Sequence, residues 1–250
     1  MFTSSETLSY YTKTNILIWM LMAFQAGTIN VAGLMIAHRF VSHTTGFATF
    51  FGVEAASGNY IEALGMLVVP IFFLVGVMLS AYLIDRRIQH NHRPYYPIAM
   101  GLVFILISIN CVMGIKGYYG EFGRSPDIAN HWFLLICLCM SCGLQNATVT
   151  SVYGANVRTT HLTGLTTDLG IGIIRILTHS HKLQTRGHEL IANFMRVGLI
   201  VSFISGSLVG AGLYLRLSYW GLVLPSMISC GIFVWSIWRF YQHRNPGHKH

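Results

Sequence analysis

Long apolar stretches separated by short polar segments dominate this chain. Six of them are long enough to cross about 30 Å of hydrocarbon as helices. They cover approximately residues 15–37, 61–84, 94–115, 131–153, 190–215 and 219–240. This pattern predicts an all-α, polytopic membrane helix bundle with six transmembrane helices. We expect one integral membrane domain over residues 1–250.

Two further segments, 43–57 and 161–177, are shorter and richer in Gly and Thr. As helices they would extend only about 22 Å and about 26 Å, at 1.5 Å per residue. Such lengths are more typical of re-entrant helices than of complete crossings. The sequence therefore predicts six transmembrane helices plus two short re-entrant helices.

The distribution of Lys and Arg predicts the orientation. With six crossings, 12 basic residues fall on one side of the membrane and 4 on the other; with eight crossings the division is 10 against 6. Because positive residues concentrate in cytoplasmic loops, six crossings with both termini cytoplasmic is the preferred arrangement.

Composition supports the bilayer as the main partner. The chain is 53% hydrophobic and 10% charged, with a mean hydropathy of +0.55, whereas a soluble domain carries about 25% charged residues. The formal net charge of +8 could indicate nucleic acid, but excess Lys and Arg in a multi-spanning protein usually lies beside anionic headgroups. No nucleic-acid partner is expected. We expect the first apolar stretch to be a retained span because no basic region or cleavage site precedes it.

The same short polar phrase occurs twice. "VSHTTG" at 41–46 and "RTTHLTG" at 158–164 each carry His, Thr and Gly, and "FLVGVMLSAYL" at 73–83 aligns without a gap with "FISGSLVGAGL" at 203–213. Each half then consists of a span, a re-entrant helix and two spans, over about 12–116 and about 131–241. Three crossings is an odd number, so the second copy would be inverted, as is common in secondary transporters. Chance similarity between apolar helices is the alternative.

Two longer stretches carry a family resemblance. "AGTINVAGLMIAHRFVSHTTG" at 26–46 and "GLQNATVTSVYGANVRTTHLTGLTTDLG" at 143–170 resemble the signature stretches of the YoaK-like family. The resemblance extends over nearly the whole chain and implies a six-span protein of the bacterial inner membrane. That family has the status of a domain of unknown function, so no activity follows. Asn30 departs from the pattern, because many relatives are expected to have an acidic residue there.

The repeated phrase predicts a binding site. Two half-helices entering from opposite faces would direct their positive N-terminal ends at a shared midplane site. With two Arg residues nearby, such a site favours a small anionic or zwitterionic solute. The predicted solute-binding residues are Gln25, Asn30, Arg39, His43, Thr45, Gly46, Gln145, Asn146, Arg158, His161, Thr163, Gly164 and Asp168. The alternative is that these residues only stabilise the fold.

Asp168 is the most distinctive candidate because an ionisable group at membrane depth is costly. It could carry a proton, or it could form a structural ion pair with Arg158 or Arg175. The leading functional hypothesis is a secondary transporter or permease, and the competing one is a non-transporting scaffold or sensor.

Other chemistry is not supported. Cys139 and Cys142 form a CxxC within an apolar stretch, where small packing residues are the better interpretation. Three His-x-His pairs, at 90/92, 179/181 and 248/250, have no accompanying Cys or acidic ligands. We therefore expect no metal, no cofactor and no enzymatic activity. Small-residue pairs at 76/80 and 206/210 predict tight helix contacts, within the protomer or in a homodimer.

Overall fold

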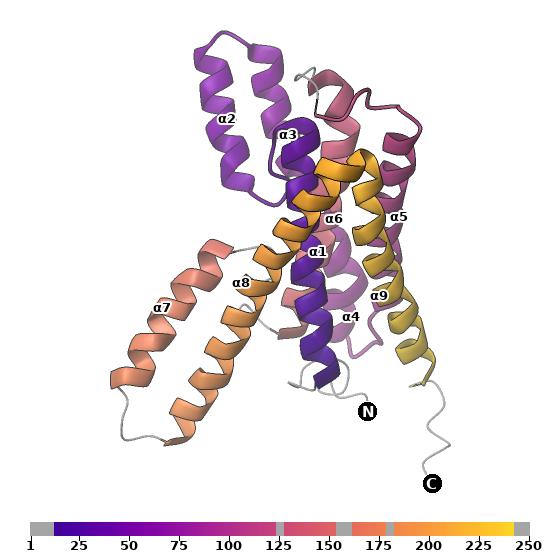
Figure 1. The fold of residues 1–250 in the computed structure, drawn as a ribbon. Helices are drawn as coiled ribbons and strands as arrows, with labels where there is room; N and C mark the ends of the chain where they lie inside the picture. The colour runs from indigo at the N-terminus through magenta and orange to yellow at the C-terminus, as the bar shows by residue number, and fades with distance from the viewer. Residues whose placement is uncertain (1–12, 124–127, 154–161, 179–182, 243–250) are drawn as a thin grey trace.

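A computed structural model describes residues 13–123, 128–153, 162–178 and 183–242, and all regular structure in these ranges is helical (Figure 1). The elements are α1 (Lys13–Ala37), α2 (Thr44–Ala56), α3 (Tyr60–Ser80), the π-helical turn η1 (Ala81–Asp85), α4 (Arg86–Gln89), α5 (Tyr96–Ile115), α6 (Ile128–Tyr153), α7 (Leu162–Thr178), α8 (Leu183–Leu217), the 3₁₀ turn η3 (Ser218–Leu222) and α9 (Val223–Gln242).

The predicted spans correspond to α1, α3 with η1, α5, α6, α8 and α9. Among the residues that the structure describes, five helical stretches are long and apolar enough to cross a membrane, and the last of these, Glu189–Gln242, contains most of α8 and all of α9. Hence the chain is a helical membrane protein. One boundary differs clearly from the prediction: α8 begins at Leu183, seven residues before the expected span. Hydropathy marks only the apolar part of this helix, and Glu189, just before that part, forms an ion pair with Arg175 in the last turn of α7.

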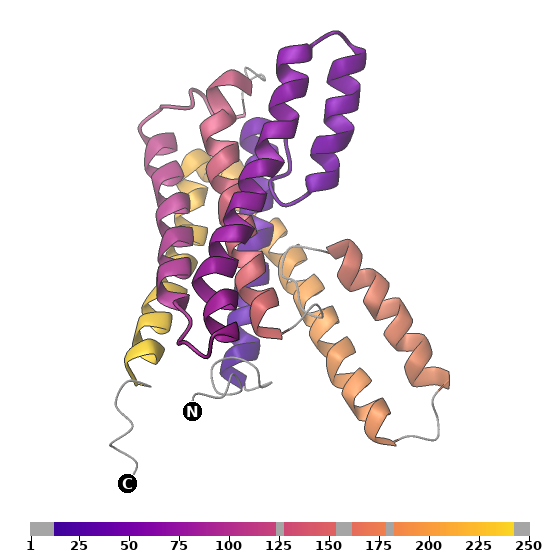
Figure 2. The same ribbon diagram turned by 180° about the vertical axis from the view of Figure 1, so that it is seen from behind.

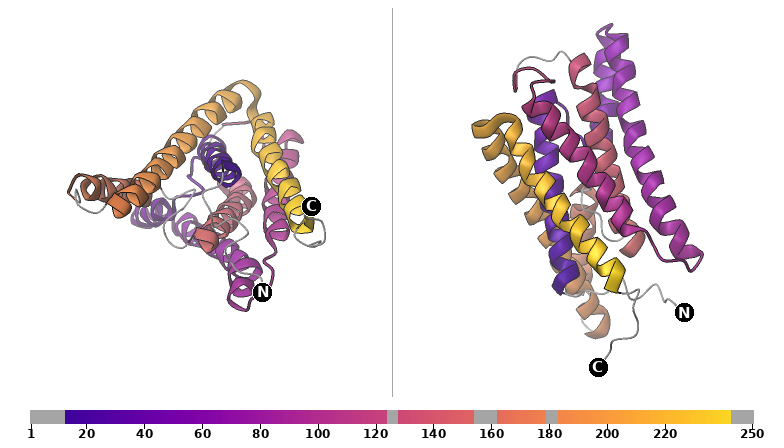
Figure 3. Two further views of the ribbon diagram at one scale, coloured as in Figure 1. Left: turned by 90° about the horizontal axis from the view of Figure 1, so that it is seen from below. Right: turned by 90° about the vertical axis from the view of Figure 1, so that its right-hand side faces the viewer.

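Helices α1 and α6 form the centre of the bundle. Their apolar windows are 61% and 72% buried, against 22% for Tyr60–Gln89 and 28% for Glu189–Gln242. Each central helix packs mainly on a long outer helix, α1 on α8 and α6 on α3, while α5 packs on α9 (Figure 3). Large apolar side chains such as Ile61 and Leu208 are 88% and 74% exposed. Such outward apolar surfaces are those that lipid would cover.

Glycines form both main helix crossings. A Cβ on Gly206 of α8 would collide with the Phe24 carbonyl of α1, and one on Gly76 of α3 would collide with the Met140 carbonyl of α6. Only glycine allows the backbones this close. The predicted small-residue pairs therefore make contacts within the protomer.

The two short helices reach only part of the bundle's height. α2 begins at the level of the middle of the bundle and runs to one end, where α3 turns back; α7 begins at a similar level and runs to the opposite end, where α8 turns back (Figures 1 and 2). The start of α1 and the end of α9 lie at the same end as this second turn (Figure 1). The structure therefore places the amino-terminal ends of α2 and α7 at mid-height.

Candidate functional site

The segment between α1 and α2 is held by Asn30. The Asn30 Oδ1 atom accepts hydrogen bonds from the backbone N–H groups of Val41 and Ser42, both at 3.2 Å, and from Ser42 Oγ at 3.0 Å. On the other side, Cys139 Sγ of α6 donates to the Val41 carbonyl at 3.1 Å. Irregular backbone inside a membrane requires such partners. Asn30 thus serves as an acceptor for backbone groups, a role that needs no carboxylate.

α1 ends at a left-handed residue. His38 has φ +54°, and the N–H of Arg39 donates to the Gly33 carbonyl at 3.3 Å. A Cβ on Gly33 would lie 2.8 Å from the Arg39 carbonyl oxygen. The chain therefore folds closely back on the last turns of α1, and this return delivers it to the start of α2.

Arg39 is almost completely buried, with 9% of its surface exposed. Its guanidinium forms an ion pair with Glu54 at 3.5 Å, lies 4.1 Å above the Phe50 ring, and donates to the His38 carbonyl at 3.0 Å. Its Nε atom is buried without a hydrogen-bond partner. The positive charge predicted for this site is therefore balanced by a carboxylate from the last turn of α2.

The His-x-Thr-Gly phrase forms a closed turn at the start of α2. The Thr45 hydroxyl bonds the Nε2 atom of His43 at 2.8 Å, and the N–H of Gly46 donates to the His43 carbonyl at 2.9 Å. A Cβ on Gly46 would lie 3.1 Å from His43 Nδ1, so the ring covers the glycine. His43 and Thr45 are exposed, and no side chain caps the first turn of α2. The helix start remains open to a ligand.

Gln25 and Gln145 meet at the α1–α6 interface. Gln25 Nε2 donates to Gln145 Oε1 at 2.9 Å, and Gln145 Nε2 donates to the Met22 carbonyl at 2.7 Å. Both side chains are buried. This pair joins the two central helices, which is the fold-stabilising role, although the Gln25 Oε1 atom has no hydrogen-bond partner.

The second half of the predicted site is described only in part, because Arg158 and His161 lie outside the described residues. Asn146 of α6 is half-buried, and its Oδ1 atom is buried without a partner. Thr163 and Gly164 lie in the first turn of α7, where Thr163 is exposed. These residues form the start of α7, as Thr45 and Gly46 form the start of α2.

Asp168 lies half-buried on α7. Arg175, one of its two predicted ion-pair partners, is bound to Glu189 of α8 at 3.0 Å. Within the ranges that the structure describes, Asp168 forms no ion pair. Arg158, its other predicted partner, lies outside the described residues, so that ion pair stays a prediction.

No group of three His, Cys, Asp or Glu side chains that could hold a metal occurs among the residues described. Cys139 and Cys142 are buried thiols. Cys139 donates to the segment before α2, so its role is structural.

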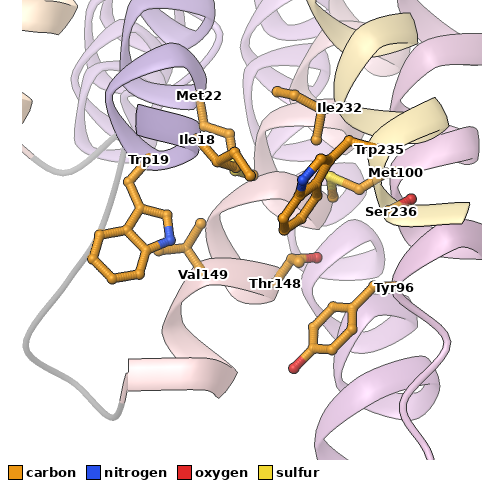
Figure 4. A pocket seen from close by; sticks show the side chains of 10 residues that line it. All are labelled: Ile18, Trp19, Met22, Tyr96, Met100, Thr148, Val149, Ile232, Trp235 and Ser236. Carbon is orange, nitrogen blue, oxygen red and sulfur yellow. The ribbon is translucent and has the colours of Figure 1, made fainter. Parts of the chain in front are cut away.

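A small apolar cavity of about 30 Å³ lies between α1, α5, α6 and α9 (Figure 4). Trp19, Met100 and Trp235 surround it, and the Thr148 hydroxyl at its wall is already bonded to the Leu144 carbonyl at 2.8 Å. None of the predicted solute-binding residues lines this cavity. Its lining is almost entirely apolar, so it offers few polar partners to an anionic or zwitterionic solute.

Most of the chain matches a known protein family. Residues 18–235, from α1 to α9, match the model of a family described as "Protein of unknown function (DUF1275)". The chain belongs to the DUF1275 family. No curated protein and no solved structure matches the chain. DUF1275 membership is consistent with the YoaK-like resemblance, and it assigns no activity.

Several contacts of this DUF1275 protein were not predicted from the sequence. The pairing of Arg39 with Glu54 joins residues fifteen apart with no periodic signal. In contrast, Glu189, Asn193 and Arg196 follow the i, i+4, i+7 spacing of one helix face within an apolar stretch. That spacing was a signal from which a polar α8 face could have been predicted.

Proposed function

We propose that this DUF1275 protein is a secondary transporter or permease of the bacterial inner membrane, with both termini cytoplasmic and a small anionic or zwitterionic solute as cargo. One observation carries the proposal. The amino-terminal ends of α2 and α7 both lie at mid-height, while their carboxyl-terminal ends point to opposite ends of the bundle (Figure 1). In this proposal, both are re-entrant half-helices that flank a solute site.

Two matching helix crossings support an inverted repeat. Gly27 of α1 packs against the Phe203 carbonyl of α8, as Gly143 of α6 packs against the Phe73 carbonyl of α3. Phe73 and Phe203 are also paired by the gapless sequence alignment. In this register Asn30 and Asn146 are equivalent, each lying three residues after its glycine, whereas Gln25 and Gln145 are contact partners.

The exposed polar groups at the starts of α2 and α7 are the reason for expecting an anionic or zwitterionic solute. The first turn of α2 has no side-chain cap and carries exposed Thr44 and Thr45; the first turn of α7 carries exposed Thr163. N–H groups at a helix start favour an anionic ligand group. Asp168, two turns into α7, is then placed to take up a proton with the solute.

A thermal-shift screen of organic acids, amino acids and inorganic anions on the purified protein tests the binding step. We expect at least one solute to stabilise the wild type and to lose its effect in Asp168→Asn, while Glu62→Gln, which removes a carboxylate from the first turn of α3, retains it. Uptake into proteoliposomes with an imposed proton gradient then tests transport. A hit whose uptake does not exceed that of protein-free vesicles would refute transport.

A non-transporting scaffold or sensor is the second candidate. It is favoured by the internal use of the polar side chains: Asn30, Gln25 and Gln145 all bond to the protein itself. In that case no solute in the screen changes the melting temperature, and the Asn30 and Gln145 variants alter stability alone.

A further inference from the structure

A polar seam lies between α7 and α8, apart from the proposed solute site. Glu189, Asn193 and Arg196 share one face of α8. Glu189 forms ion pairs with Arg175 of α7 at 3.0 Å and with Arg196 at 3.5 Å. Arg196 also donates to Asn193 Oδ1. Two guanidinium groups thus share one carboxylate, which leaves the seam with a formal charge of +1.

Close packing fixes the inner part of this seam. A Cβ on Gly172 of α7 would lie 2.7 Å from Arg196 Nη1 and would collide with Asn193 Oδ1. The Asn193 side chain is 8% exposed, and its Nδ2 atom is buried without an acceptor. The side chains of Arg196 and Glu189 are 12% and 19% exposed. The inner groups therefore hold one another and place the carboxylate next to Arg175.

Arg175 forms the open edge of the seam. Its side chain is 56% exposed, and its only ion pair within the described ranges uses one Nη1 donor. An arginine has five N–H donors, of which the bond to Glu189 uses one. It occupies the last turn of α7, at the end of the bundle where α1 begins and α9 ends (Figure 1).

Exposed apolar side chains lie close in sequence to Arg175 on α7 and to its partner Glu189 on α8. Leu177 of α7 and Phe194 of α8 are each 70% exposed, and Ile174 and Leu190 are 58% and 51% exposed. A guanidinium at the end of a helix whose exposed side chains are largely apolar matches a phosphate head with acyl chains.

We propose that the α7–α8 seam binds the phosphate group of an anionic phospholipid, with Arg175 donating to the phosphate oxygens. The acyl chains then lie along the exposed apolar side chains of α7 and α8. Glu189 orients Arg175, and Arg196 offsets the charge of Glu189, so that the carboxylate does not repel the phosphate. A soluble phosphate ester offers the same charged group without the chains.

The test uses the full chain purified in a neutral detergent, with lipid binding measured by native mass spectrometry. The probes are phosphatidylglycerol, phosphatidylcholine and glycerol phosphate. The variants are Arg175→Gln, Arg175→Lys and, as a matched control, Arg216→Gln. Arg216 is an exposed arginine in the last turn of α8, at the opposite end of the bundle.

We expect phosphatidylglycerol to bind more tightly than phosphatidylcholine, and Arg175→Gln to weaken that binding about fivefold, the effect of one arginine at an anionic membrane surface. Arg216→Gln should not change it. Arg175→Lys should lose part of the affinity because a point charge replaces the guanidinium fork, and it serves as the decisive variant if Arg175→Gln does not fold.

Equal losses in the Arg175 and Arg216 variants would show general charge attraction and overturn the proposal. Equal binding of glycerol phosphate and phosphatidylglycerol would assign the seam to a soluble phosphate and overturn the lipid assignment. No preference for phosphatidylglycerol would also overturn it. None of these outcomes bears on whether the protein transports a solute.

Discussion

Gln25 of α1 and Gln145 of α6 are joined by a hydrogen bond of 2.9 Å between Gln25 Nε2 and Gln145 Oε1. The two side chains are 1% and 2% exposed. Apolar side chains and lipid surround this pair, so no water can replace a hydrogen-bond partner that one amide loses. The pair therefore selects one register of α1 against α6.

Replacing one glutamine of this pair should lower the free energy of unfolding by more than that residue contributes to the contact, because its partner is left unsatisfied. In Gln145→Leu, Gln25 Nε2 loses its acceptor and the Met22 carbonyl loses its side-chain donor, so we expect a loss of about 1–3 kcal/mol of unfolding free energy. The double variant Gln25→Leu/Gln145→Leu should lose less than the sum of the two single variants. Equilibrium unfolding in mixed micelles measures the cycle, and strict additivity would contradict the coupling.

At position 30, an oxygen atom that accepts hydrogen bonds should be essential for stability, whereas the neutral amide group should not. Asn30→Asp keeps an oxygen at the position that receives the N–H groups of Val41 and Ser42, and we expect near-native stability. Asn30→Leu has the same approximate size without an acceptor and should lose about 2 kcal/mol. The melting temperatures of both purified variants check this. A stable Asn30→Leu protein would show that the segment before α2 is held by other contacts.

Glycine at the helix crossings should not tolerate even one methyl group. We expect Gly206→Ala and Gly76→Ala each to destabilise the protein by about 1–3 kcal/mol, because backbone must move to admit the Cβ atom. Gly212→Ala is the matched control on α8, since its added Cβ would meet no atom within 4 Å beyond the neighbouring backbone of its own helix. Thermal unfolding of the three variants provides the comparison. Destabilisation of Gly212→Ala to the same degree would attribute the effect to helix flexibility instead.

Tyr119 should anchor the loop between α5 and α6. Its hydroxyl donates to Asn110 Oδ1 at 2.6 Å, and Asn110 is 0% exposed. Tyr119→Phe leaves that buried oxygen without its donor, so we expect a loss of about 1–2 kcal/mol. The melting temperature of this variant at neutral pH gives the measurement. An unchanged value would mean that ring packing alone holds the loop.

The same residue predicts a pH dependence. Burial raises the pKa of Tyr119 well above its usual 10, with smaller contributions from Cys137, Tyr118 and Tyr219. The unfolded chain loses this proton near pH 10 while the folded chain keeps it, so the Tyr119 contribution to stability should fall as pH rises above about 10. Unfolding free energies of wild type and Tyr119→Phe between pH 8 and 11 should therefore converge at the alkaline end. A constant difference would contradict the retained proton.

The lengths of the elements were predictable because they depend on local hydrophobicity. The stretches 43–57 and 161–177 appear as α2 (Thr44–Ala56) and α7 (Leu162–Thr178) within one residue at each end. A run of apolar residues determines how far a helix can extend through hydrocarbon, and His, Thr and Gly mark where the chain can turn.

The candidate site residues could be identified from the sequence, but the residues that they contact could not. Asn30 and Arg39 were expected to contact a solute, and the structure gives Asn30 a segment of backbone and Arg39 a carboxylate. Likewise, Gln25 and Gln145 were expected to bind a solute, and the structure joins them to each other. A polar residue in an apolar stretch indicates that a partner exists, but the partner is on another helix.

The sequence by itself therefore determined an all-helical membrane protein, the extents of its apolar helices and the positions of two short helices between them. Only the tertiary structure decided that α1 packs on α8 and α6 on α3, that Asn30 holds the backbone of Val41 and Ser42, and that Arg175 shares Glu189 with Arg196. The physical reason is the range of the forces involved. Hydrophobic length and turn chemistry act between neighbours along the chain, whereas glycine crossings, amide pairs and shared carboxylates require the directions of side chains on helices far apart in sequence.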